Sequence, residues 1–250
     1  MFHHFHGGRH PNVQGSISQQ DFERIIRFLD PRRILTPFEW LEKVHEGRPN
    51  ASDLCLTFDD GLLSQYEIAL PVLDKYRLKA FWFVYSCVFE GQLAKFEVYR
   101  AFRSRFFPDV DAFYETFFRS VSEELGVNAH EAVPEAEIER FRKSYPFYSV
   151  NDVRFRLLRD RVLTTAGYEH VMDELIQARG LRLTDLAADL WMSNDHLRRL
   201  SGDGHVVGLH SYSHPMVLGG LAHERQREEY EKNSVHLKRV CGTAPIVAAH

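Results

Sequence analysis

The sequence predicts an α/β protein built on a parallel sheet and interrupted by a long helical insertion. Short apolar runs alternate with helix-like segments near both ends of the chain, which is typical of strand–helix–strand units. Residues 89–191 instead carry charged and aromatic patterns at helical spacing, with no strand-like run. The length of 250 residues and the hydrophobic content of 44% suit one large domain or two small ones.

The first part of the sheet is expected within residues 1–88. Residues 1–6 form a short strand that ends at two glycines. Ser18 and Thr36 are candidate N-caps of two helices. Further strands are expected over residues 54–58 and 80–84, joined by a helix over 64–76. Pro71 marks a kink or a late start of that helix, because proline lacks the backbone N–H.

The strand and helix alternation returns over residues 192–250. Ser193 caps a helix that runs to about Leu200. A strand over 206–209, a charged helix over 224–240 and a last strand over 246–249 follow. We therefore divide the chain into a first part of a catalytic domain (1–88), a helical insertion (89–191) and a second part of that domain (192–250).

Composition excludes several classes of protein. The net charge of −4 gives no electrostatic reason to expect nucleic-acid binding. The three cysteines are far apart in the sequence, so they form neither a disulfide framework nor a cysteine zinc site. No stretch is long and apolar enough for a signal peptide or a membrane span, which predicts a soluble, cytoplasmic protein.

Two predicted strands end in residues that suit a metal site. Asp59 and Asp60 follow one strand, and His210 and His214 follow another. The carboxyl ends of parallel strands share one face of a sheet or barrel, so the two clusters are expected to meet. One carboxylate and two imidazoles can bind a divalent ion, typically zinc, and the other carboxylate then remains free to act as a base. Histidines four apart face the same way if the backbone makes a helical turn.

Each cluster alone has an ordinary explanation. Asp-Asp-Gly after a strand is usually a turn, and a lone His-x-x-x-His is often a coincidence in a chain with 14 histidines. Their joint placement at strand ends favours a site. A zinc-peptidase motif is excluded because Ser211 occupies the position of its glutamate. An iron site with two histidines and one carboxylate stays open, but it leaves the second aspartate without a role.

Both clusters resemble motifs of a known family. Thr57-Phe58-Asp59-Asp60-Gly61 and His210-Ser211-x-x-His214 resemble the first two motifs of the polysaccharide deacetylase family, also called the NodB-homology or carbohydrate esterase 4 family. The segment KAFWFVY resembles the family's KATFFV strand, and the resemblance spans roughly residues 1–85 and 192–250. It implies a distorted parallel (β/α) barrel of the NodB type, incomplete in this chain.

The resemblance also implies a reaction. Asp59 would be the general base, and Asp60, His210 and His214 would hold one divalent ion, expected to be Zn²⁺. The reaction would remove an acetyl or formyl group from the nitrogen of an amino sugar in a surface polysaccharide or its precursor, as in lipopolysaccharide biosynthesis. Two alternatives stay open: an amide hydrolase acting on a small non-sugar substrate, and a sugar-binding relic without catalysis.

Two motifs of the family have no clear match, namely the Arg-x-Pro loop and the late histidine strand that supplies the general acid. The start of the chain resembles circularly permuted members, which places His3 at the position of the acid, on the side of the metal away from Asp59. Strand alternation points His4 and His6 to the opposite face. Gly61, Tyr66 and His250 are candidate substrate-binding residues.

The remaining charged residues are expected at the surface. Arg154, Arg156, Arg159 and Arg161 read as a solvated helix face rather than as contacts for the phosphates of a nucleotide sugar. His130, His170, His205 and His236 show no partner pattern and are also expected to be exposed. The insertion is expected to cover the catalytic end of the barrel, because insertions after barrel strands project from that face.

Overall fold

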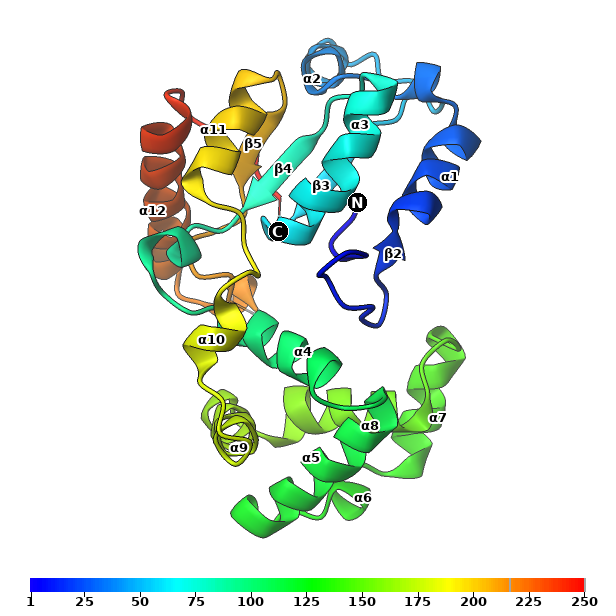
Figure 1. The fold of residues 1–250 in the computed structure, drawn as a ribbon, viewed down its shortest axis with the longest axis vertical. Helices are drawn as coiled ribbons and strands as arrows, with labels where there is room; N and C mark the ends of the chain where they lie inside the picture. The colour runs from blue at the N-terminus through cyan, green and yellow to red at the C-terminus, as the bar shows by residue number, and fades with distance from the viewer. Residues whose placement is uncertain (216, 250) are drawn as a thin grey trace. The chain divides into compact units, whose positions relative to one another are not determined.

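The computed structural model describes residues 1–215 and 217–249, and these form two compact units (Figure 1). Unit 1 contains Met1–Ala94 and Ala187–His250, and unit 2 contains Lys95–Leu186. The insertion expected over 89–191 is thus a few residues longer than unit 2. The first and last residues of the expected insertion belong to unit 1 and form hydrogen bonds there. The Gln92 N–H donates to Cys87 O (3.1 Å), and the Leu63 N–H donates to Leu190 O (2.9 Å).

Three short parallel strands form the main sheet of unit 1. They are β3 (Thr57–Asp59), β4 (Phe81–Val84) and β5 (Val206–Leu209), with β4 in the centre. Both edges are extended by single parallel bridges, from Phe2 to Phe58 and from Leu209 to Ala248. Segments near both ends of the described chain therefore flank the sheet. The expected strand over 246–249 is reduced to that one bridge.

A second, two-stranded parallel sheet pairs β1 (Phe5–His6) with β2 (Ile17–Ser18). Within the described residues the two sheets stay separate and do not close into a barrel. The fold is thus mixed α/β with parallel strands, as expected, and closure of the expected incomplete barrel is not observed among these residues.

The helices of unit 1 begin largely where local sequence signals placed them. They are α1 (Gln19–Leu29), α2 (Pro37–His45), α3 (Leu70–Tyr76), α11 (Asn194–Gly202) and α12 (His223–Cys241). Ser18, Thr36 and Ser193 cap helices as predicted, each in a capping box. A π-helical stretch (Gln65–Ala69) precedes α3, so the α-helix starts late, one residue before Pro71. Short 3₁₀ turns lie at Pro31–Arg33, Cys87–Glu90 and Leu218–Gly220.

The core of unit 1 is rich in aromatic rings. Phe58 and Trp82, on neighbouring strands, are fully buried and stack with ring centroids 4.3 Å apart. Phe22 from α1 packs edge-on against Phe58. Figure 1 shows α1 and α3 on the β3 side of the sheet, with α11 and α12 on the β5 side. Trp82 is therefore a core residue, and its stacking on Phe58 joins β3 and β4, the first of which carries the aspartates.

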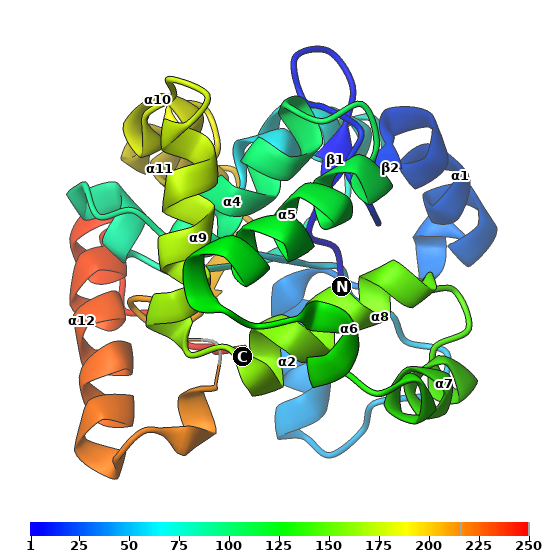
Figure 2. The same cartoon turned by 90° about the horizontal axis from the view of Figure 1, so that it is seen from below.

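Unit 2 is entirely helical in the described residues (Figure 2). Its elements are α4 (Lys95–Arg105), α5 (Val110–Leu125), α6 (Ala129–Ala132), α7 (Glu135–Ser144), α8 (Val150–Leu157), a π-helix (Leu158–Val162), α9 (Thr165–Gln177) and the start of α10 (Leu183–Ala187). Phe113, Phe117 and Phe155 form its aromatic core. Among the described residues of the whole chain, no helix is long and apolar enough to cross a membrane.

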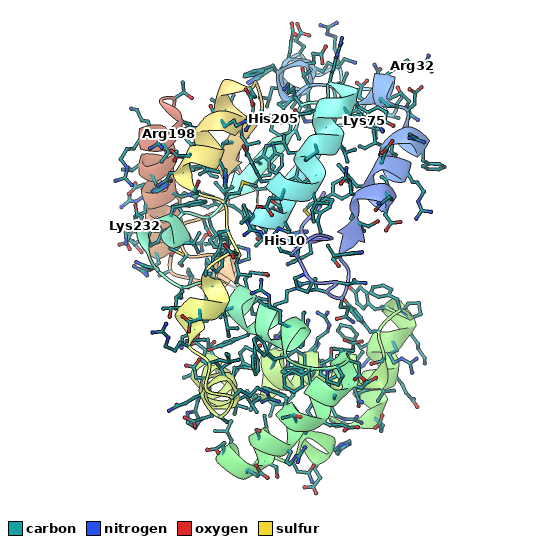
Figure 3. The ribbon with its side chains drawn as sticks, in the orientation of Figure 1. His10, Arg32, Lys75, Arg198, His205 and Lys232 are labelled. Carbon is teal, nitrogen blue, oxygen red and sulfur yellow. The ribbon has the colours of Figure 1, made fainter. Side chains whose placement is uncertain are left out.

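Some side chains expected at the surface are buried. Arg154 is 3% exposed and pairs with Glu135 of α7, so the arginine-rich segment is not simply a solvated helix face. His236 is also buried, with Nε2 2.9 Å from Asn194 Oδ1. His205 lies at the amino end of β5 (Figure 3) and is 3% exposed. These expectations were wrong because tertiary packing, rather than local periodicity, decides the burial of these residues.

Candidate metal centre

A tight turn after β3 buries both aspartates of the first motif. Asp60 and Gly61 have positive φ values of 78° and 64°, so the chain reverses sharply as it leaves the sheet. A Cβ atom on Gly61 would lie 2.9 Å from Val84 Cγ1, which leaves room only for glycine. Asp59 and Asp60 are 3% and 5% exposed. The strained backbone at Asp60 thus points to a site where side-chain position matters.

The histidine pair lies in the loop that follows β5. His210 and His214 have ring centroids 4.9 Å apart. The backbone between them is not the helical turn expected from their spacing, because Ser211 and His214 have φ values of 65° and 53°. Ser211 Oγ accepts a hydrogen bond from the His214 N–H (3.1 Å) and stabilises this irregular turn.

Two buried polar residues of α12 hold the histidine loop in place. The Glu229 carboxylate accepts from the N–H groups of Tyr212 (2.9 Å) and Ser213 (2.7 Å) and from the Ser213 hydroxyl (2.8 Å). Asn233 Oδ1 accepts from the His210 N–H (3.0 Å), and its Nδ2 donates to Val84 O (3.1 Å). Asn233 therefore ties the histidine loop to the end of the central strand.

Asp60, His210 and His214 have the spacing and chemistry of a metal site. The Nε2 atoms of His210 and His214 lie 3.5 Å and 3.6 Å from Asp60 Oδ1, and the three ligand atoms are all within 4.8 Å of one another. Zinc bonds of about 2.0–2.1 Å in a tetrahedron place ligand atoms about 3.3–3.4 Å apart. Asp60 Oδ1 is buried and accepts no hydrogen bond. A divalent cation would satisfy this oxygen.

The hydrogen bonding of His210 fits a ligand role. Its Nδ1 lies 2.8 Å from the Ala249 carbonyl oxygen, which can only accept, so Nδ1 carries the proton. In the neutral ring, Nε2 then presents its lone pair towards Asp60. A second hydrogen bond that fixes the tautomer in this way is typical of metal-binding histidines.

The ionisable groups of the site influence one another's pKa values. Burial alone would raise the pKa of Asp60, but the attraction of His210, His214 and His3 brings it below its ordinary value. For Asp59, burial dominates and raises the pKa of the carboxyl. Burial would lower the pKa of His210, but Asp60 and the Ala249 carbonyl together raise it. The two adjacent aspartates therefore differ in their affinity for a proton.

His3 lies beside Asp59. Its Nε2 atom is 3.6 Å from Asp59 Oδ2, and its side chain is about one-third exposed. Gln65 Nε2 donates to the carbonyl oxygens of His3 (2.8 Å) and Asp59 (2.5 Å), which fixes the N-terminal segment against β3. The expectation that His3 lies on the side away from Asp59 is thus wrong. Parallel pairing with β3 positions the two side chains as neighbours.

The other candidate residues have structural contacts. The carbonyl of Gly61 accepts from the Met192 N–H (2.9 Å). The ring of Tyr66 stacks on His196 with centroids 4.2 Å apart. Substrate binding by Gly61 and Tyr66 stays a prediction, and His250 lies outside the described residues. His6, expected to face away from the site, lies with Nδ1 2.9 Å from Ser16 Oγ.

Sequence reasoning missed the residues that support the site, namely Glu229, Asn233 and Gln65. A usable signal existed on α12, where Glu229 and Asn233 are one turn apart on the stripe that continues to the buried Leu237 and Val240. Polar residues on a stripe that faces the core need buried partners, and loop backbone groups are common ones.

Comparisons with known proteins find a family profile that matches part of the chain and two structures of similar fold. The profile of the family described as Polysaccharide deacetylase matches residues 167–249, which include both histidines but not the two aspartates. A solved structure of "Streptococcus pyogenes deacetylase PplD in complex with acetate" is similar over 98% of this chain and 69% of that chain, with a TM-score of 0.52 and 13% identity. The structure of IcaB from Ammonifex degensii covers the same shares at 16% identity, with a TM-score of 0.45. Among curated proteins, none matches this chain in sequence.

Parallel strands that end in an Asp-His-His cluster beside a second aspartate define a candidate metal site on an α/β fold. The profile match covers the histidine motif, and the likeness to PplD extends over nearly the whole chain at the level of the fold. Residues 167–249 thus resemble the polysaccharide deacetylase family, and the likeness of the chain to PplD is one of fold.

Proposed function

We propose that this protein is a metal-dependent hydrolase that removes an acetyl or formyl group from the nitrogen of an amino sugar in a surface polysaccharide or its precursor. The convergence of Asp60, His210 and His214 beside Asp59 carries the proposal. The similar PplD structure was determined with acetate, the product of such a reaction on an acetylated substrate.

Asp60, His210 and His214 would hold the divalent ion, for which we propose Zn²⁺. The bound ion would supply Lewis acidity towards the scissile carbonyl and the attacking water. Asp59 directly precedes Asp60 in the sequence, and its raised pKa suits a group that must take up a proton. In our proposal, Asp59 accepts the proton that water loses as it attacks the carbonyl carbon.

His3 is proposed to protonate the leaving amine. Breaking the carbon–nitrogen bond needs a proton on nitrogen, and histidine is a natural donor near neutral pH. His3 gives its proton to the amine nitrogen, and Asp59, whose Oδ2 lies 3.6 Å from His3 Nε2, then returns to His3 the proton that it took from water. Water and amide are thus converted to a carboxylic acid and an amine with all protons accounted for.

Release of acid from a substrate panel tests this function. The purified chain, loaded with Zn²⁺, is incubated with N-acetylated and N-formylated amino sugars, their oligosaccharides and a cyclic ureide. We expect acetate or formate release from an amino sugar. Asp195→Asn, which changes an exposed aspartate of α11, serves as the control and should leave the rate unchanged.

The other outcomes separate the alternatives. Turnover confined to the cyclic ureide would replace the sugar substrate by a small amide. Sugar binding by the zinc-loaded protein without any release of acid would identify a binding protein and refute the proposed reaction.

A further inference from the structure

The helical unit contains a cavity of about 90 Å³ that lies entirely within residues 95–186. Its walls come from α4, α5, α8, the π-helix 158–162 and α9. A single water needs only about 10–15 Å³ of such space, so the cavity can hold several waters or one small polar group. None of the catalytic candidates belongs to this unit.

Four half-buried arginines line the cavity: Arg100, Arg103, Arg156 and Arg159. Arg159 is neutralised by Asp160, with Nε 2.5 Å from Oδ1 and a second bond of 2.8 Å. No carboxylate of the described chain lies within ion-pairing distance of Arg103 or Arg156. Arg103 and Arg156 therefore bring positive charge to the cavity without an ion-pair partner among the described residues.

Aromatic rings orient these guanidinium groups. The Arg103 guanidinium carbon lies 5.8 Å and 5.7 Å from the ring centroids of Phe113 and Phe155. That of Arg156 lies 4.2 Å from the ring of Tyr148. Stacking fixes the plane of a guanidinium group while leaving its N–H edges free to donate hydrogen bonds. The arginines are thus preorganised rather than freely mobile.

Tyr168 provides a second observation that points to a ligand. Its side chain lines the same cavity and is 7% exposed, yet its hydroxyl makes no hydrogen bond with the described residues. An acceptor bound in the cavity would take a hydrogen bond from this hydroxyl. Burial raises the pKa of Tyr168 to about 12, so the hydroxyl keeps its proton and can donate.

We propose that this cavity binds the phosphate group of a small phosphorylated molecule. Several planar guanidinium forks around one space match the oxygens of a phosphate, which carries more charge and more acceptors than a carboxylate. The phosphate could belong to free inorganic phosphate or to a nucleotide, since the same oxygens would be recognised. The proposed site replaces the initial interpretation of Arg156 and Arg159 as part of a solvated helix face.

Calorimetric titration of the full chain tests the site. The probes are inorganic phosphate, pyrophosphate, a nucleoside diphosphate and neutral N-acetylglucosamine, at low ionic strength because salt screens such contacts. We expect a phosphate-bearing probe to bind, and Arg103→Gln and Arg156→Gln to weaken binding by about tenfold or more, as for hydrogen bonds to charged groups. Tyr168→Phe should weaken it by a few-fold. Arg119→Gln, an exposed arginine of α5, is the matched control and should bind like the wild type.

The comparison of probes identifies the source. Equal affinity for phosphate and nucleoside diphosphate indicates a free-phosphate site, and tighter binding of the nucleotide indicates a nucleotide site. If a glutamine variant does not fold, Arg103→Lys keeps the charge, loses the planar fork and should still weaken binding. Absence of binding by the folded wild type, or equal weakening by Arg103→Gln and Arg119→Gln, would overturn the proposal. The titration measures the binding of phosphate and not the release of acid. A negative result would therefore leave the proposed deacylase activity unaffected.

Discussion

Two adjacent aspartates at the end of β3 show how neighbouring residues acquire different surroundings. Asp60 faces the two imidazoles of the β5 loop, whereas Asp59 faces His3. The sequence predicted that one carboxylate would bind metal and the other would act as a base. It could not assign the roles without a family resemblance, because the left-handed backbone at Asp60 separates the two side chains.

Removing the proposed base should separate catalysis from metal binding. Asp59→Asn keeps the shape of the side chain but cannot accept a proton as a carboxylate does. We expect the variant to retain its metal and to lose about 10²- to 10⁴-fold in turnover, the usual contribution of a positioned base. Metal analysis and the rate of acid release check both parts, and an unchanged rate would move the base elsewhere.

The proposed acid can be tested against its neighbour in the sequence. His3→Gln should lower turnover by about 10²- to 10⁴-fold while metal content stays unchanged. Added imidazole should restore part of the lost rate. His4→Gln is the comparison, because the His3 and His4 rings lie with centroids 6.2 Å apart, so the expected opposite orientation of His4 is not observed. A larger loss for His4→Gln than for His3→Gln would show that the register of the N-terminal segment is wrong.

His205 predicts a pH dependence of stability. Its Nδ1 accepts from the Ala80 N–H and the Trp82 indole N–H, both at 3.1 Å, and burial lowers its pKa from 6.5 to about 4. The unfolded chain therefore binds more protons between these pH values, so stability falls as the pH falls. We expect a loss of about 2 kcal/mol between pH 7 and pH 5.

Urea unfolding at both pH values measures this effect. His205→Gln should be less stable at pH 7 but should lose this part of the pH dependence. The exposed His130→Gln should behave like the wild type. The role of His205 is refuted if the His205→Gln and wild-type proteins lose the same free energy of unfolding on acidification.

At the scale of elements, the sequence predicted the features that depend on local contacts, but not those that depend on contacts with distant residues. Ser18 and Thr36 cap helices through contacts within three residues, which the sequence contains in full. The turn between His210 and His214 depends on Glu229, which is distant in the sequence, so the expected helical geometry was wrong. Burial of Arg154 likewise depends on a partner in another helix.

The support from α12 should control metal affinity. Glu229→Gln replaces a carboxylate that accepts three hydrogen bonds by an amide whose NH₂ group faces donors. We expect metal affinity to fall by about 10- to 100-fold, as for other residues that orient metal ligands. Glu231→Gln, on an exposed face of the same helix, should leave the affinity unchanged. Equal affinities for both variants, measured by competition with a chelator, would contradict a positioning role.

At the scale of the whole molecule, chemistry divides between two units. Asp59, Asp60, His210 and His214 all belong to unit 1, which also holds most of the stretch that matches the polysaccharide deacetylase profile, residues 167–249. The arginine-lined cavity belongs to unit 2. The family resemblance could therefore predict the candidate metal site but says nothing of the insertion. That the insertion covers the catalytic end of the fold stays a prediction.

Anomalous X-ray scattering from crystals soaked in zinc tests the central claim most directly. We predict one strong peak at the zinc absorption edge, at bonding distance, about 2.0–2.2 Å, from Asp60 Oδ1, His210 Nε2 and His214 Nε2. The same experiment on His214→Ala should show this peak strongly reduced. A peak at other residues, or none near Asp60 in zinc-saturated crystals of the wild type, would contradict the assignment of the metal centre.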